Sequence, residues 1–169
     1  MINEKLENEL NAQINRELFS EYLYLSIAMY CSSMNFPGME NFFVVQGQEE
    51  HFHAMKIINY LNSRRGRVIL KAIDEPRVDF NSIEEAFTAA LQHEEFITKS
   101  INNLMDLAIK ENDHSARTFL QWYVTEQDEE EETFDSLVNR LKLVSNNGQA
   151  LLMLDKELGA RKFTPPVEE

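Results

Sequence analysis

Four long segments with a helical spacing of apolar residues constrain this sequence more than any other feature. They cover about residues 3–33, 39–65, 82–111 and 113–145, and a shorter fifth pattern covers about 148–159. Each long segment would form a helix of roughly 45 Å at about 1.5 Å per residue. Helices of that length need neighbours along their whole extent to bury their apolar faces. The pattern therefore predicts an all-α four-helix bundle with a short fifth helix.

The connections between these segments predict the order in which the helices pack. The first connection is NFPG, where Pro37 and Gly38 indicate a tight turn, and the third is equally short, so each joins an antiparallel hairpin. The middle connection, GRVILKAIDEPRVDFN, is too long for a tight turn and contains Pro76 within an extended pattern. We expect it to form one long crossover along the side of the bundle, between the second and third helices.

Several helix ends carry recognisable capping signals. Gly66 predicts a left-handed cap after the second helix. The sequence S-I-E-E predicts a capping box of Ser82 and Glu85 at the start of the third, and Asp113 is a good N-cap for the fourth. We expect one domain over residues 1–169, with a frayed tail over 160–169.

Composition narrows the classes of partner and compartment. The net charge of −13 argues against nucleic acid as a partner, because phosphates require a basic surface. The acidity fits either a solvated surface or a cationic partner such as a metal ion. The single cysteine fits a reducing compartment, and no segment has the roughly 18 apolar residues of a membrane span. With no signal-peptide pattern at the start, we expect a cytoplasmic protein with no membrane partner.

Each long helix is predicted to carry a carboxylate in the middle of its buried face. Phasing the helices at about 100° per residue places Glu17, Glu50, Glu94 and Glu130 between apolar residues. The short stretch QEEHFH also places His53 three residues after Glu50, so that both side chains share one face within a single turn. A lone buried histidine is more often a core residue than a ligand, but this spacing suits two ligands to one ion.

The same spacing occurs in both hairpins. Glu50 lies 33 residues after Glu17 and is followed three residues later by His53. Gln127 lies 33 residues after Glu94 and is followed three residues later by Glu130. Each hairpin therefore places one glutamate opposite a pair of polar side chains on the next helix.

The buried faces carry no Lys or Arg that could neutralise these glutamates. Burying four unpaired carboxylates would cost several kcal/mol each, and a multivalent cation removes that cost. Zinc prefers more histidine or cysteine ligands, and calcium does not use histidine. Two irons bridged by Glu50 fit best, with manganese as the nearest alternative.

The sequence gives weaker evidence for the roles of the residues next to these faces. The side chain of Tyr24 either reaches the site or packs in the core, and Trp122 is more typical of packing than of redox chemistry. His51 and His93 are predicted at the surface, and His114 has no visible ligand role. Within EQDEEEE, the last two glutamates are predicted to be a solvated acidic face.

Together these residues resemble the ferritins, specifically the bacterial non-haem type. The resemblance covers nearly the whole chain, including QEEHFHAMK, HEEFIT and FLQWYVTEQDEEE. It implies a ferritin-like bundle that stores iron in a hollow shell of 24 subunits. It also implies a ferroxidase that oxidises Fe(II) with O2 or peroxide and deposits ferric mineral inside the shell.

The resemblance further implies a role for each polar residue. The first iron would be held by Glu17, Glu50 and His53, and the second by Glu50, Glu94 and Glu130. Gln127 would lie beside the irons, and Tyr24 matches the tyrosine next to the centre. A third iron site typical of bacterial members would be formed by Glu49, Glu126, Glu129 and Glu130.

Departures from neighbouring families sharpen this expectation. Bacterioferritins carry a second Glu-x-x-His on the fourth helix and a haem-ligating methionine, where this chain has Gln127-x-x-Glu130 and Phe52. We therefore expect no haem. The single cysteine excludes the C-x-x-C iron module of rubrerythrins. The stretch DHSARTFLQ is poor in the acidic residues that line the iron pore of animal ferritins, which leaves the iron uptake route open.

Two other functions fit parts of the pattern. A di-iron oxidase or oxygenase acting on an organic substrate would also use buried carboxylates, but it is typically anchored by two histidines. A structural or binding bundle without redox activity would explain the helices but not the repeated spacing.

Overall fold

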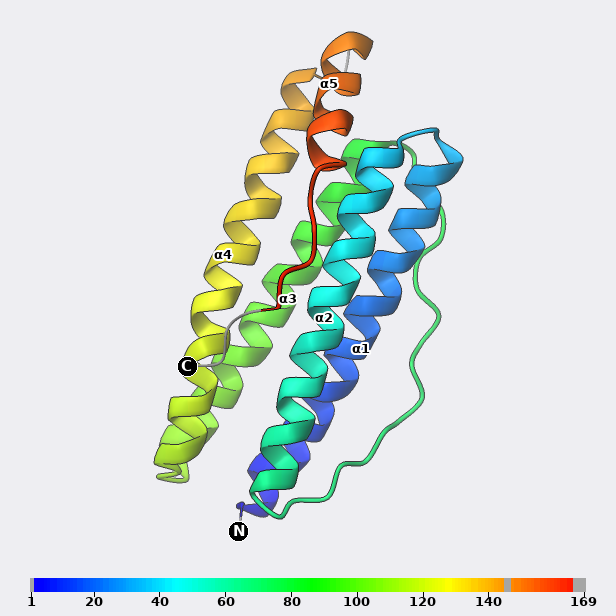
Figure 1. Ribbon diagram of the computed structural model, residues 1–169. Helices are drawn as coiled ribbons and strands as arrows, with labels where there is room; N and C mark the ends of the chain where they lie inside the picture. Colours follow the sequence, from blue (N-terminus) through cyan, green and yellow to red (C-terminus); the bar gives the residue numbers. More distant parts are fainter. Residues whose placement is uncertain (1, 145–146, 166–169) are drawn as a thin grey trace.

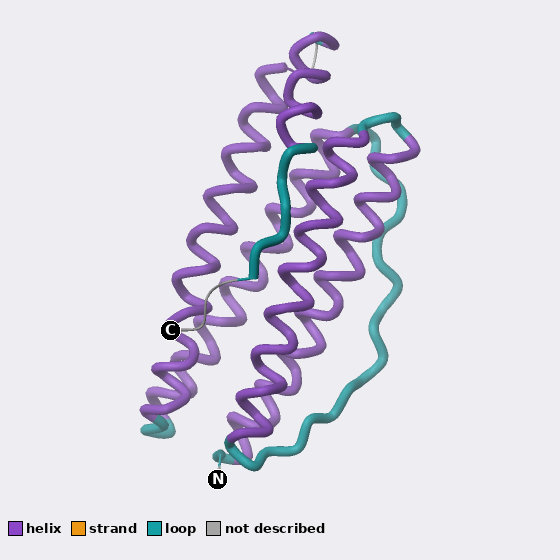
Figure 2. The backbone as a smooth tube through the Cα atoms, viewed as in Figure 1, coloured by secondary structure: helices purple, strands orange, loops and turns teal. Residues whose placement is uncertain are grey.

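Five helices make up the computed structural model, which describes residues 2–144 and 147–165 (Figure 1). They are α1 (Glu4–Ser33), α2 (Pro37–Ser63), α3 (Ile83–Lys110), α4 (His114–Val144) and α5 (Gly148–Leu158). The described residues contain no strand, so the predicted all-α bundle with a short fifth helix is confirmed (Figure 2). Among the described residues, no helix combines the length and the apolar character needed to cross a membrane.

The helices pair as the connections predicted. The helix α1 packs along α2, α3 packs along α4, and the two hairpins meet through α1 and α3. The backbones of α2 and α4 approach each other less closely. The predicted crossover runs beside α1 (Figure 1). It is fixed there by Asn11, whose side chain accepts from the Ile69 N–H at 2.7 Å and donates to the Arg67 carbonyl at 2.9 Å.

The apolar core is divided into two clusters. One contains Phe43, Phe87 and Phe134, and the other contains Leu10 and Ile57. Along every long helix, the buried glutamate lies between the segments that supply these two clusters. The bundle therefore contains a polar layer near its middle, closed at both ends by packed apolar side chains.

The predicted caps are mostly present, with two differences. The Ser82 hydroxyl accepts from the Glu85 N–H at 3.1 Å, while the Glu85 carboxylate bonds the N–H one residue before Ser82. The prediction of a left-handed Gly66 is wrong, because Arg65 takes that conformation with φ of 61° and no described glycine has a positive φ. The Gly66 N–H still closes the helix by donating to a carbonyl of the last turn at 2.9 Å.

Asp113 caps α4 and ties it to the end of α2. One oxygen accepts from the Ala116 N–H at 2.9 Å, and both oxygens accept from the Arg64 guanidinium at 3.1 and 2.8 Å. The hydrogen bonds from Arg64 lower the pKa of the Asp113 carboxyl below its ordinary value of 3.8.

We expect Asp113→Asn to destabilise the protein by about 0.5 kcal/mol at pH 7, because the cap is kept while a partly exposed ion pair is lost. Asp113→Ala should cost about 1 kcal/mol more, because it also removes the cap. Since the folded pKa lies below the unfolded one, the ion pair stabilises at neutral pH. Its contribution is lost as pH falls below about 4. Urea unfolding at pH 7 and pH 3 measures both effects, and equal stability of the Asn and Ala variants would contradict the capping role.

The segment after α5 returns along the bundle and is docked against α2. The Arg161 guanidinium lies 4.4 Å from the centroid of the Phe42 ring, and the Phe163 ring lies 6.5 Å from that of Phe52. The expectation of a frayed tail from residue 160 is therefore wrong for this part. Residues 166–169, and Ser145 at the predicted end of the fourth helix, lie outside the described residues.

Helix α5 is anchored on the first turn of α2. The Asp155 carboxylate accepts from the Met39 N–H at 2.8 Å, so a side chain of α5 satisfies a free donor at the start of α2. Gly38 lies against the backbone of α5, and a Cβ at this position would be 1.7 Å from the Asp155 carbonyl oxygen. The absence of a side chain at Gly38 is what allows the two helices to approach.

Candidate metal centre

Six polar residues predicted from the sequence lie together in the middle of the bundle. Their side chains are almost completely buried, with exposed fractions of 0 to 6%. Helix α1 supplies one, α2 two, α3 one and α4 two, so that the whole bundle is needed to build the layer. The six are Glu17, Glu50, His53, Glu94, Gln127 and Glu130.

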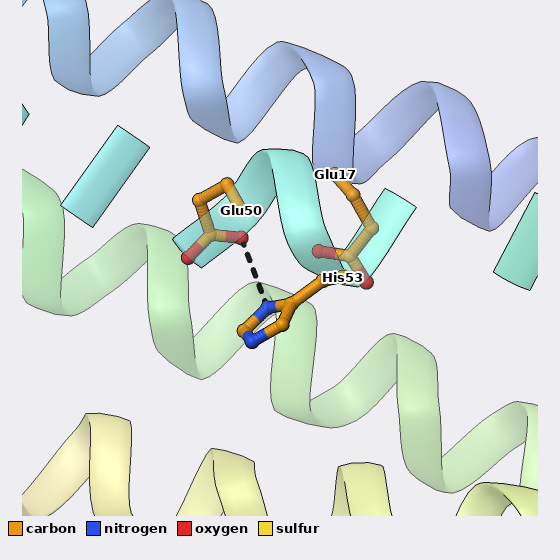
Figure 3. Close-up of side chains that lie close together, drawn as sticks. All are labelled: Glu17, Glu50 and His53. Carbon is orange, nitrogen blue, oxygen red and sulfur yellow. Dashed lines mark ion pairs between the residues drawn. The ribbon is translucent and has the colours of Figure 1, made fainter. Parts of the chain in front are cut away.

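Glu17, Glu50 and His53 form a compact group whose ligand atoms all lie within 4.8 Å of one another. Figure 3 shows the three side chains pointing toward one another from α1 and α2. The His53 Nδ1 atom is 3.5 Å from Glu50 Oε2. Both His53 Nδ1 and Glu17 Oε2 are buried without a hydrogen-bond partner. Unsatisfied buried donors and acceptors are costly, and a cation between these atoms would satisfy them.

A second group shares the same histidine. His53, Glu126 and Glu130 have ligand atoms within 4.8 Å of one another, and His53 Nε2 is 3.9 Å from Glu126 Oε1. Glu126 is half-buried, whereas the members of the first group are fully enclosed. The imidazole therefore lies between a closed site and a more open one.

Glu94 belongs to neither compact group, and both of its oxygens accept hydrogen bonds from neutral donors. The Tyr24 hydroxyl donates to Oε1, and the Gln127 amide donates to Oε2 at 3.0 Å. The Tyr24 hydroxyl therefore contacts the polar layer while its ring packs against Phe134 in the core, so both roles left open by the sequence are present. Gln127 lies beside the Glu94 carboxylate, and its position beside the irons stays a prediction.

The buried carboxyl groups of the layer are stable either when they are protonated or when they bind a metal ion. Burial, and then the neighbouring carboxylates Glu94 and Glu17, raise the pKa of Glu50 well above its usual range. Burial raises the pKa of Glu94 to about 7, and burial together with Glu94 and Glu50 raises that of Glu130 strongly. A divalent cation would reverse these shifts by stabilising the ionised carboxylates.

The flanking carboxylates Glu49, Glu126 and Glu129 are arranged less uniformly. Only Glu126 joins a compact group, and Glu129 is exposed. Glu49 forms an ion pair with Arg161 at 2.5 Å. No Lys or Arg is among the buried residues of the described helices, but the tail after α5 brings an arginine to this edge of the layer.

Sequence reasoning did not assign a role to two glutamines. The Gln13 amide donates to Glu17 Oε1 at 2.8 Å, and the Gln46 amide donates to Glu130 Oε2 at 2.8 Å. A signal for both was present, because each lies four residues before a buried glutamate and the two are 33 residues apart. They orient ligand carboxylates without adding charge.

The predictions for the other histidines and for Trp122 have different outcomes. His51 is exposed, as expected. His93 is half-buried rather than freely exposed, because its ring bonds Ser20 at 2.7 Å, and this burial lowers its pKa to about 4. Trp122 packs edge-on to His53 with ring centroids 5.4 Å apart, consistent with a packing role.

Known proteins are similar to this chain in sequence and in fold. The ferritin-like domain of the Ferritin family matches residues 7–144. The chain belongs to the ferritin family. A bacterial non-heme ferritin of Staphylococcus aureus (strain USA300) is 38% identical over 163 residues, which cover 96% of this chain and 98% of that protein. A bacterial non-heme ferritin of Staphylococcus epidermidis is 37% identical over the same shares of each chain.

Solved ferritin structures agree with the fold. The open pore ferritin of the archaeon Archaeoglobus fulgidus superposes with a TM-score of 0.95 at 44% identity, over 96% of this chain and 100% of that one. An engineered closed form of the Archaeoglobus fulgidus ferritin gives a TM-score of 0.96 at 45% identity, over 97% and 100%. These likenesses support iron storage as the function of this ferritin, and they do not favour an oxidase acting on an organic substrate.

Proposed function

We propose that this ferritin oxidises Fe(II) with O2 at the polar layer and stores the ferric product inside a homo-oligomeric shell. The observation that carries the proposal is the enclosed group of Glu17, Glu50 and His53, with buried atoms that lack partners. A structural bundle has no reason to keep such atoms at the centre of its core. Iron is the substrate and the cargo in this account.

Each ligand has a proposed role. Glu17, Glu50 and His53 hold the first Fe(II), and Glu50, Glu94 and Glu130 hold the second. In this proposal Glu50 is the shared ligand, because its side chain lies beside His53 and its charge is also repelled by that of Glu94.

The neighbouring side chains hold or release protons and orient the ligand carboxylates. Carboxylates that carry protons near neutral pH must release them when Fe(II) binds, so loading should acidify an unbuffered solution. Burial raises the pKa of Tyr24 well above its usual range, which keeps its hydroxyl a donor to Glu94. Oxygen-rich ligands stabilise Fe(III) relative to Fe(II), which favours the transfer of electrons to O2.

We also propose that Glu49, Glu126, Glu129 and Glu130 hold a third iron beside the pair. The support is the second group, in which Glu126 and Glu130 share His53, and the half-buried position of Glu49 next to them. This site faces outward from the enclosed pair, so it suits iron on its way to or from the mineral.

Replacing all three flanking carboxylates by Ala should leave the first rapid oxidation of two irons per subunit largely intact. The ratio of iron oxidised to O2 consumed, and the later turnover, should change, because a third Fe(II) supplies an extra electron. An oxygen electrode read alongside ferric absorbance measures both quantities. Loss of the first phase would place these residues in the paired site, and unchanged ratio and turnover would make them a solvated acidic face.

The shell is supported by apolar residues left exposed at one end of the bundle. Leu143, Leu152 and Met153 have exposed fractions of 85, 60 and 68%. Such side chains are compatible with a contact between subunits. We propose the 24-subunit shell of the family, whose mass light scattering would give directly.

Aerobic addition of Fe(II) to the metal-free protein tests the proposed function against its rivals. Storage predicts many ferric ions retained per subunit. A di-iron oxidase acting on an organic substrate predicts about two, and a binding bundle predicts none oxidised. Either of the last two results would overturn the proposal.

A further inference from the structure

The tail after α5 places a cation directly on the proposed third site. One arm of the Arg161 guanidinium donates to Glu49 Oε2 at 2.5 Å, and another donates to Gln46 Oε1 at 2.7 Å. The guanidinium also lies over the Phe42 ring, and the Arg161 carbonyl accepts from the Asn41 side chain at 3.0 Å. Three kinds of contact therefore fix this arginine on α2, in the direction of the layer.

Gln46 extends the contact from Arg161 to the paired site. Its amide oxygen accepts from the guanidinium, while its amide nitrogen donates to Glu130 Oε2 at 2.8 Å and to Glu50 Oε1 at 3.4 Å. This polarity orients the glutamine, because only the oxygen can face Arg161 and only the nitrogen can face the carboxylates. A displacement of Arg161 would thus be transmitted to a ligand of the iron pair.

The charge of Arg161 competes with a metal at the same atoms. The guanidinium and the side chain of Glu49 are only 25% and 21% exposed, so solvent screens their attraction incompletely. A second cation, Lys56, lies over the Trp122 ring at 4.7 Å and acts on Glu126 only at longer range. Arg161 is the cation bonded to Glu49 among the described residues.

We propose that Arg161 is a latch on the third site. When that site is empty, the guanidinium neutralises Glu49 and holds the tail over α2. A metal ion that binds Glu49 must displace it, which releases residues 160–165 from α2. This inference rests on the proposed third site, and it adds that the position of the tail regulates the binding and release of iron there.

The surroundings offer the displaced arginine a second position. A hollow of about 790 Å³ adjoins Arg161 and is lined on the α4 side by Glu132, an exposed carboxylate that is not a proposed iron ligand. A guanidinium leaving Glu49 can therefore remain charged and paired a short distance away. The exchange does not require the arginine to enter an apolar environment.

Anaerobic titration of Fe(II) into the assembled metal-free shell, followed by calorimetry, tests the latch. We expect Arg161→Gln to bind the third Fe(II) about tenfold more tightly than the unchanged protein, because a competing cation is removed. Binding of the first two Fe(II) ions should change much less, because Arg161 reaches their ligands only through Gln46. Arg161→Lys should give an intermediate affinity, because it keeps the charge but loses the two-armed contact.

Arg140→Gln is the matched control. Arg140 lines the same hollow, but its guanidinium pairs with Glu157 on α5 and does not bond Glu49. The control should bind the third Fe(II) as the unchanged protein does. If Arg140→Gln tightens the third site as much as Arg161→Gln, general charge rather than a latch explains the effect, and the proposal fails.

Hydrogen–deuterium exchange on the unchanged protein gives a readout that needs no variant. Residues 160–165 should exchange faster when three metal ions are bound than when two are bound. Equal exchange, or an unchanged third affinity in Arg161→Gln, would overturn the latch while leaving the iron pair intact. Absence of the first two binding events would instead overturn the proposed function.

Discussion

Glu50→Ala should lower the initial rate of Fe(II) oxidation by at least about 100-fold, because the substitution removes the one carboxylate proposed to contact both irons. His53→Ala should have nearly as large an effect, since it removes the sole imidazole and weakens the first iron. Stopped-flow absorbance of the ferric product under air measures these rates. Glu95→Ala is the matched control, because Glu95 is an exposed carboxylate beside Glu94 on the same helix. This variant should oxidise Fe(II) at the normal rate.

The metal-free Glu50→Ala protein should be at least as stable as the unchanged one. Glu50 is buried among other carboxylates, so its removal relieves desolvation and repulsion when no cation is present. A fall in rate without a fall in unfolding midpoint therefore identifies a ligand rather than a folding defect. An unchanged initial rate in Glu50→Ala would show that the paired site is misplaced.

Gly38→Ala should destabilise the protein by about 3 kcal/mol or more, because even one methyl group would overlap the backbone of α5. The added Cβ would be 1.7 Å from the Asp155 carbonyl oxygen, and a backbone atom cannot move aside as a flexible side chain can. Detaching α5 also breaks the Asp155 bond to the Met39 N–H. Urea unfolding measures the loss, and faster hydrogen exchange in α5 would locate it.

Gly148→Ala is the control for this prediction. Gly148 begins α5, and a Cβ there would meet nothing within 4 Å. Its replacement should be neutral or slightly stabilising, because alanine favours the helix. Equal stability of the Gly38 and Gly148 variants would contradict the close approach of α2 and α5.

The fold and the centre of the site were predictable because both follow from helical periodicity. Glu17, Glu50, Glu94 and Glu130 lie on buried faces that a period of about 3.6 residues defines, and short loops leave few ways to pair such helices. The shift of the left-handed position from Gly66 to Arg65 lies within the usual uncertainty of helix ends.

The contact between Arg161 and Glu49 could not be predicted in the same way. The two residues are 112 positions apart, and Arg161 lies outside any helix, so no periodicity relates them. The burial of His93 depends on Ser20 of another helix and on the exact rotation of α3. Contacts of this kind require the three-dimensional structure.

Diffraction from crystals soaked anaerobically in Fe(II), recorded on both sides of the iron absorption edge, tests the central claim most directly. The account predicts two strong anomalous peaks per subunit inside the bundle, with the Glu50 carboxylate between them and His53 on one of them only. A weaker third peak should lie near Glu126 and Glu130. Peaks confined to the exposed acidic surface, with none between Glu17 and Glu94, would contradict it.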